Sequence, residues 1–183
     1  MGLLFGGVAL WWLAHLFKRI APGPRATLGE PGKGAVALAL VGSIALMYFG
    51  YAGAAWSEVY TPPAWGRHAN NLLMLIAVIL FGMSMSKGRM RGWLRHPMLT
   101  GFAVWALAHL LVRGDTASVV MFGGLGLWAL VTMPVVSRAA GPWQRPAPGP
   151  IAGDVRLILI SIIVYAVIVA VHWQVFGLYP FAG

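Results

Sequence analysis

Residues 95 to 115 read RHPMLTGFAVWALAHLLVRGD, and the order of charged and apolar residues in this stretch decides the fold. An apolar run from Met98 to Val112 lies between two arginines and contains one ionisable side chain, His109. A bilayer core is crossed by roughly 17–25 residues of apolar helix. The run is short but can extend into its flanks, so we expect a membrane helix with a histidine inside it.

The composition of the whole chain agrees with this expectation. Of 183 residues, 60% are hydrophobic and 9% are charged, which is far from the balance of a soluble domain. The chain has no cysteine, which excludes disulfides and thiolate metal sites. The net charge of +9 is typical of cytoplasmic loops rich in lysine and arginine, so we expect the lipid bilayer as partner and no nucleic acid.

The apolar runs predict an all-α integral membrane protein with six transmembrane helices in a single domain, residues 1–183. Three clusters of proline and glycine, at 22–34, 61–66 and 141–150, predict loops because proline lacks the amide donor of a helix interior. The expected helices cover about 2–17, 35–55, 69–85, 98–112, 117–137 and 155–176.

Lysine and arginine alternate between the loops. The first, third and fifth loops hold Lys18, Arg19, Arg25 and Lys33, then Lys87, Arg89, Arg91 and Arg95, then Arg138, Arg145 and Arg156. The second and fourth loops hold only Arg67 and Arg113. The positive-inside rule then predicts that the first, third and fifth loops are cytoplasmic and that both termini lie on the other side of the membrane. The first apolar run precedes its basic residues, which indicates a membrane helix rather than a signal peptide.

One pattern occurs twice. The segments WWLAHLFKR (11–19) and WALAHLLVR (105–113) match at six of nine positions and lie on the first and fourth expected helices. Helices three apart run in opposite directions, so the match favours an inverted repeat of three helices each. The alternative is chance, because leucine and alanine are common in this chain.

The repeated pattern places an aromatic ring next to each buried histidine. Positions four apart share a helix face, so Trp11 lies beside His15, and Gly101, Trp105 and His109 form one stripe. Such a stripe suits a flat ligand such as haem, whose iron a neutral imidazole can bind. The alternative is that each histidine makes a hydrogen bond between helices and each tryptophan packs.

The other polar residues give weaker signals. His68 and His96 each follow an arginine at an expected helix start, where contact with lipid headgroups is the simpler interpretation. His172 falls in the outer aromatic belt expected near the end of the sixth helix. The four acidic residues do not form a catalytic pair, and no phosphate-binding loop, zinc motif or nucleophile elbow is present.

Two motifs carry a resemblance to a known family. The chain contains RHPML-x-G-x3-WALAHL-x3-GD at 95–115 and PPAW-x-RH-x3-LLML at 62–75. With the histidine of the first helix, these motifs resemble the NnrU family of membrane proteins, over most of the chain through about residue 137. The same domain occurs in 15-cis-zeta-carotene isomerase, which is similar to a haem b enzyme with two histidine ligands.

The resemblance implies haem b held by His15 and His109, with Trp11, Trp105 and Gly101 shaping the pocket. It further implies redox-linked chemistry at that haem, either cis–trans isomerisation of a polyene such as zeta-carotene or a role in nitric oxide and denitrification metabolism. The isomerase has a cysteine three residues before the second histidine, and this chain has Ala106 there. A ligand exchange through a thiolate is therefore excluded.

Two other functions stay open from the sequence. One is a non-enzymatic accessory factor for respiratory or denitrification complexes. The other is an S-adenosylmethionine-dependent membrane methyltransferase, to which RHP-x3-G is similar, although the paired acidic signature of those enzymes is missing from residues 138–156.

Depth in the membrane is the main test of the histidine pair. His15 is expected in the inner half and His109 in the outer half, each roughly 6–8 Å from the midplane. Pairs at equal height are His15 with His96, or His109 with His68 or His172. A structure should distinguish among these pairs.

Overall fold

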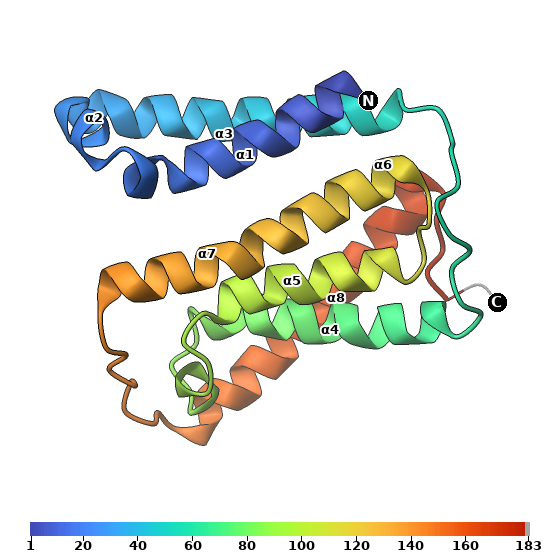
Figure 1. The fold of residues 1–183 in the computed structure, drawn as a ribbon. Helices are drawn as coiled ribbons and strands as arrows, with labels where there is room; N and C mark the ends of the chain where they lie inside the picture. The colour runs from blue at the N-terminus through green and yellow to red at the C-terminus, as the bar shows by residue number, and fades with distance from the viewer. Residues whose placement is uncertain (182–183) are drawn as a thin grey trace.

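The computed structural model describes residues 1–181 as helices joined by short loops (Figure 1). No strand occurs in that range. The helices are α1 (Gly2–Ile20), α2 (Pro22–Thr27), α3 (Gly29–Ala52), α4 (Gly66–Met83), α5 (Pro97–Leu110), α6 (Thr116–Ser118), α7 (Gly124–Ala140) and α8 (Ile151–Phe176), with a 3-10 turn η1 (Met90–Gly92) and a π-helical turn η2 (Val119–Gly123). Helix α6, turn η2 and helix α7 form one continuous stretch.

All six apolar segments form helices, but one of the three predicted loops is mostly helical. The proline cluster 22–34 is mostly helical, since it contains α2 and the first turns of α3. Pro22 and Pro24 lie in the first turn of α2, and Pro31 lies in the first turn of α3. A first turn has no intrahelical partner for its amides, so proline costs little there. The cluster 141–150 is a loop as expected.

Five of the helical stretches are long and apolar enough to cross a membrane: Gly2–Ile20, Gly29–Ala52, Gly66–Met83, Thr116–Ala140 and Ile151–Phe176. Helix α5 is the exception, because its 14 residues fall below the usual length of a span. The chain therefore has the make-up of a multi-pass membrane protein. The expected count of six spans depends on α5.

The helices pack mainly as neighbours along the chain. Helices α1 and α3 form an antiparallel hairpin that lies beside the group formed by α4, α5, α7 and α8 (Figure 1). Within that group α5 packs on α4 and α7, and α8 packs on α4. Contacts from α1 to α7 and η2 join the hairpin to the rest.

The contacts between the two three-helix halves are not symmetric, although the first two helices of each half pack together, α1 on α3 and α5 on α7. Helix α4 packs along α5, but the equivalent pair under an inverted repeat, α8 and α1, makes no comparable contact in residues 1–181. The similarity between the halves lies in the two Trp-x-Leu-Ala-His segments. The inverted repeat stays a prediction that rests on those segments.

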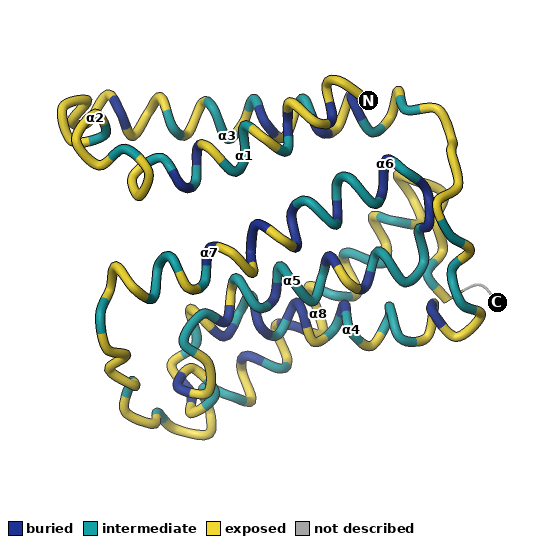
Figure 2. Tube along the Cα trace, in the orientation of Figure 1, coloured by how far each residue is buried: buried dark blue, intermediate teal, exposed yellow. Residues whose placement is uncertain are grey.

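Many large apolar residues are exposed. Exposed positions recur along every long helix (Figure 2). Helix α8 is the clearest case, since only Leu157 and Ser161 of its 26 residues are buried. In water this surface would be unstable, whereas lipid tails solvate it without cost. The burial pattern agrees with the lipid environment expected from composition.

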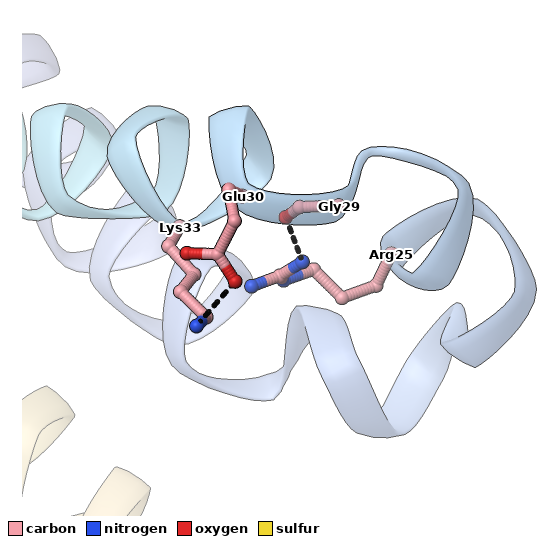
Figure 3. A network of polar contacts seen from close by, with 4 residues as sticks. All are labelled: Arg25, Gly29, Glu30 and Lys33. Atoms are coloured by element: carbon pink, nitrogen blue, oxygen red, sulfur yellow. Dashed lines mark hydrogen bonds and ion pairs between the residues drawn. The ribbon is translucent and has the colours of Figure 1, made fainter.

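The basic loops gather at one end of the molecule. The loops after α1, α4 and α7 lie at the end opposite both described termini (Figure 1). In the first of these loops Lys33 pairs with Glu30 at 2.7 Å, and an Arg25 guanidinium nitrogen donates to the Gly29 carbonyl at 3.2 Å (Figure 3). The Arg25 contact connects α2 to the start of α3, and the Lys33–Glu30 pair lies within the first turns of α3.

At the opposite end the 53–65 loop covers the turn between α5 and α6. The amides of Val59 and Tyr60 donate to the Gly114 carbonyl at 2.8 and 3.1 Å, and the Thr116 amide donates to the Ser57 carbonyl at 2.8 Å. The Tyr60 hydroxyl donates to the carbonyls of Leu110 and, at 3.0 Å, Arg113. The loop thus satisfies backbone groups that the end of α5 leaves without helical partners.

Candidate functional site

Three of the five histidines share one local arrangement. The Nδ1 atoms of His15, His109 and His172 each lie 2.8–3.0 Å from the carbonyl oxygen four residues earlier on the same helix. A carbonyl can only accept, so Nδ1 carries the proton and donates it. In the neutral ring Nε2 then holds the free lone pair, which is the form in which imidazole binds a metal.

The structure does not bring His15 and His109 to a common cavity. A chain of ring contacts separates them, from His15 to Trp128 at 4.6 Å between centroids, on to Phe102 at 5.3 Å, then Trp105 at 5.4 Å, and finally His109 at 5.0 Å. Packed aromatic rings therefore occupy the space between the two imidazoles.

His15 lies in the hydrophobic contact between α1 and α7. Its ring contacts Trp11 at 4.2 Å and Trp128 at 4.6 Å. The indole nitrogens of these two tryptophans are buried without a hydrogen-bond partner, and so is the hydroxyl of Thr132 one turn after Trp128. The expected neighbour Trp11 is thus confirmed beside His15, but in a packed cluster.

His109 instead faces a cavity of about 810 Å³ near the end that holds the termini. Ligand pockets commonly have volumes of about 300–1,000 Å³. The walls come from α3, α4, α5, η2, α8 and the residues after α8. Residues with polar side chains on the walls are Tyr48, Tyr51, Arg67, Asn70, Asn71, His109, Arg113, Tyr165, His172 and Tyr179.

The charged side chains that line this cavity are all basic. Arg67 and Arg113 line it together with His109 and His172, and no carboxylate of residues 1–181 does. Neither arginine is in an ion pair within that range, where the only salt bridge joins Lys33 and Glu30. The cavity therefore suits a ligand with an apolar body and one or more anionic groups.

A buried network positions Arg113. Its guanidinium donates to the Tyr51 hydroxyl at 3.2 Å, which lies 2.8 Å from the Ser118 hydroxyl. Ser118 donates its hydroxyl and its amide to the Asp115 carboxylate at 2.6 and 2.9 Å. Asp115 is 4% exposed and caps α6. The Asp115 carboxylate thus accepts hydrogen bonds from Ser118 and does not bind Arg113. The other N–H groups of the Arg113 guanidinium can then donate to a ligand in the cavity.

A second cavity of about 700 Å³ lies between α4, α5 and α8. Its walls are mainly apolar and include Trp105. Met74, Ile168 and His172 line both cavities. The two cavities are therefore neighbours on either side of His172.

Gly101 does not reach either cavity. A Cβ atom built on it would lie 3.1 Å from the Ala77 carbonyl oxygen and 3.2 Å from Leu80 Cβ. Gly101 thus lets α5 approach α4 closely. Of the residues expected to shape a pocket, Trp105 lines the second cavity, whereas Trp11 and Gly101 pack between helices.

The Arg-His-Pro motif at the start of α5 binds the end of α7. Arg95 donates to the carbonyls of Ser137 and Gly141 at 3.1 and 2.6 Å, and His96 Nε2 lies 2.6 Å from the Ser137 hydroxyl. Burial, and then the positive charge of Arg95, lowers the pKa of His96. The sequence interpretation as a headgroup contact missed this helix cap, while His68 is exposed at the start of α4.

Sequence reasoning also missed the cavity arginines and undervalued His172. Arg67 and Arg113 are the only basic residues of their loops, and that isolation was the available signal. No group of three or more His, Cys, Asp or Glu side chains that could hold a metal ion occurs in the described part of the chain. A haem would require only one or two histidines, because the macrocycle supplies four ligands.

These features define a multi-pass helical membrane protein with a cationic, histidine-lined cavity near one end of its helices. The comparison with known families gives the particular family. Residues 3–180 match the family model described as NnrU protein, so the chain belongs to the NnrU family. No curated protein and no solved structure matches the chain.

Proposed function

We propose that this protein binds haem b in the membrane and that His109 is an iron ligand. The observation that supports the proposal best is the His109 ring, which lines a cavity of about 810 Å³ while its Nδ1 proton is held by the Trp105 carbonyl at 2.9 Å. A hydrogen bond to the other ring nitrogen is the usual companion of a metal-binding histidine.

The lining residues fit the other parts of a haem. Tyr51, Phe122 and Met74 offer apolar and aromatic surface, and Arg67 and Arg113 offer cations for the two carboxylates of haem b. The haem, when bound, would supply redox chemistry, and the protein would set its ligation and access. Phe122 stacks on the His109 ring at 4.4 Å with 19° between the planes, which orients the imidazole.

Two reactions are consistent with family membership and with the two cavities. One is isomerisation of a membrane-dissolved polyene such as zeta-carotene, and the other is a step in nitric oxide and denitrification metabolism. The mainly apolar second cavity beside His172 supports an apolar substrate. The accessory-factor alternative remains the outcome to expect if no haem binds.

We propose that the protein lies in a bacterial inner membrane. Helix α5 would then be its sixth transmembrane span. The three basic loops would face the cytoplasm under the positive-inside rule, and both termini would be periplasmic. The cavity, which lies at the end of the termini, would then face the periplasm.

The test is an absorbance spectrum of the full chain purified in mild detergent from haem-sufficient cells. We expect a Soret band that shifts and sharpens on reduction. His109→Ala should lose the haem or change its spin state, whereas the matched variant His68→Ala, which removes an exposed histidine, should keep the wild-type spectrum. A folded, helical and colourless wild-type protein would contradict the proposal.

A further inference from the structure

His109 and His172 line the same cavity from two different helices. His109 lies in the last turn of α5, and His172 lies in the last turns of α8. Both helices pack on α4, and α5 and α8 make no comparable contact with each other. The two imidazoles therefore reach the cavity from separate helices, and α4 also lines it, through residues such as Asn70 and Met74.

The two rings also present the same atom. Nδ1 of His172 lies 2.8 Å from the Ile168 carbonyl, and Nδ1 of His109 lies 2.9 Å from the Trp105 carbonyl. No hydrogen bond within residues 1–181 engages Nε2 of either ring. Two imidazoles line one cavity, each with Nδ1 held by a carbonyl and with Nε2 free of a hydrogen bond, and they match the donor chemistry of a haem with two histidine ligands.

Neighbouring rings restrict both imidazoles. His109 contacts Phe122 and Trp105, with ring centroids 4.4 and 5.0 Å away. His172 contacts Phe176, one turn further along α8, at 5.7 Å. The second cavity is lined by His172 and Trp105 as well, so the His172 ring borders both cavities.

His15 offers the same free nitrogen but lacks the cavity. Both Trp11 and Trp128 pack on its ring, and it lines neither of the two cavities. Reaching the position of His109 would require several packed aromatic side chains to move.

We infer that His172 of α8, rather than His15 of α1, supplies the second axial ligand of the haem that His109 binds. This inference rests on the proposed function. It assigns α8 a direct part in the site and makes His15 a packing residue whose imidazole fills the contact between α1 and α7.

The experiment compares the full-length variants His172→Ala, His15→Ala and His68→Ala by absorbance and electron paramagnetic resonance of the oxidised, detergent-purified protein. We expect a six-coordinate low-spin signal in wild type, His15→Ala and His68→Ala. His172→Ala should convert to high spin, because a weak ligand or none replaces the imidazole. Added imidazole should restore the low-spin signal in His172→Ala, which shows that the fold and the cavity persist.

The outcomes of these spectra separate an error in the ligand assignment from an error in the haem proposal. A low-spin signal that survives in His172→Ala but is lost in His15→Ala would overturn the inference and leave the haem proposal intact. A low-spin signal that survives in both variants would also overturn it. A colourless wild-type protein would overturn the proposed function and the inference together.

Discussion

At the scale of single residues, three histidines with the same local hydrogen bond have different surroundings. His15, His109 and His172 each donate Nδ1–H to a carbonyl one turn earlier. This shared contact prepares each ring to bind through Nε2. Only His109 and His172 line the polar cavity. The environment brought by other helices, and not the local spacing, therefore decides which histidine can be a ligand.

Tyr60 gives a prediction at this scale. Burial, and then the negative charge of Asp115, raises the pKa of Tyr60 above its ordinary value of 10.0. The folded state thus holds the phenolic proton more tightly than the unfolded state. The resulting stabilisation is fully present below pH 10.0 and is lost as the pH rises through the folded-state pKa. We expect the free energy of unfolding to fall as the pH rises above about 10.

The measurement is chemical unfolding in detergent between about pH 8 and pH 11, with Tyr60→Phe as the matched variant. The variant lacks the hydroxyl that donates to Arg113 and should be less stable near pH 8 by about 0.5–1.5 kcal/mol. Its stability should depend less on pH than that of wild type. Parallel pH curves for the two proteins would disprove this role of Tyr60.

At the scale of elements, close helix contacts depend on a few glycines. A Cβ atom on Gly7 would lie 2.7 Å from the Met47 nitrogen, and one on Gly50 would lie 2.8 Å from Leu4 Cα. Both contacts join α1 to α3. Gly7 lies four residues before Trp11 and so shares its helix face, and it permits the close approach of α1 and α3.

Substitution of Gly50 tests that close contact. Gly50→Val should force α1 and α3 apart and lower stability by about 1–3 kcal/mol or more, because the added carbons meet backbone atoms that cannot move freely. Gly42→Val on the same helix is the control, since a Cβ atom there meets nothing within 4 Å. Thermal unfolding in detergent measures both. Equal losses in the two variants would show that helix propensity, rather than the close approach, sets the cost.

The sequence predicted the elements better than their contacts. The apolar run expected at 69–85 is the helix Gly66–Met83, and the run expected at 98–112 is Pro97–Leu110. Hydrophobic runs reveal such helices because lipid selects for them. The cluster 22–34 was predicted wrongly because proline in a first turn resembles proline in a loop.

The site could be predicted only in part, for a similar reason. His109 stood out as an ionisable residue in an apolar helix. His172 did not stand out, because its meaning depends on α8 packing against α4. No local pattern in residues 151–176 records that contact. The spacing correctly predicted that Trp11 contacts His15 and that Trp105 contacts His109. It could not predict that Trp128 and Phe102 separate these two pairs, because that depends on how the helices pack.

At the scale of the whole molecule, charge distinguishes the two ends. The three basic loops lie at one end, and Met1 and the end of α8 lie at the other (Figure 1). The cavity belongs to the second end, since the ends of α3, α5 and α8 and the start of α4 line it. This arrangement leads to a direct prediction of topology. Thr27 lies in α2 at the basic end, and Ser57 lies in the 53–65 loop at the opposite end; both are exposed.

The natural absence of cysteine makes the topology measurable. We expect a membrane-impermeant maleimide to label Ser57→Cys in intact spheroplasts, and to label Thr27→Cys only after the membrane is disrupted. The two variants carry one thiol each and serve as controls for one another. Labelling in the reverse order would invert the proposed orientation, and with it the side from which the cavity is reached.

As the proposed sixth span, the short helix α5 would have a consequence for the membrane itself. Its 14 residues span about 21 Å, against a hydrocarbon thickness of about 30 Å. Such a mismatch is relieved by local thinning of the bilayer, at a cost of fractions of a kcal/mol per Å. Headgroups and water would then dip toward the end of α5, where Arg113 and Arg67 line the cavity. A change in acyl-chain length would thereby alter how well the entrance of the cavity is hydrated, so lipid composition becomes a determinant of ligand access.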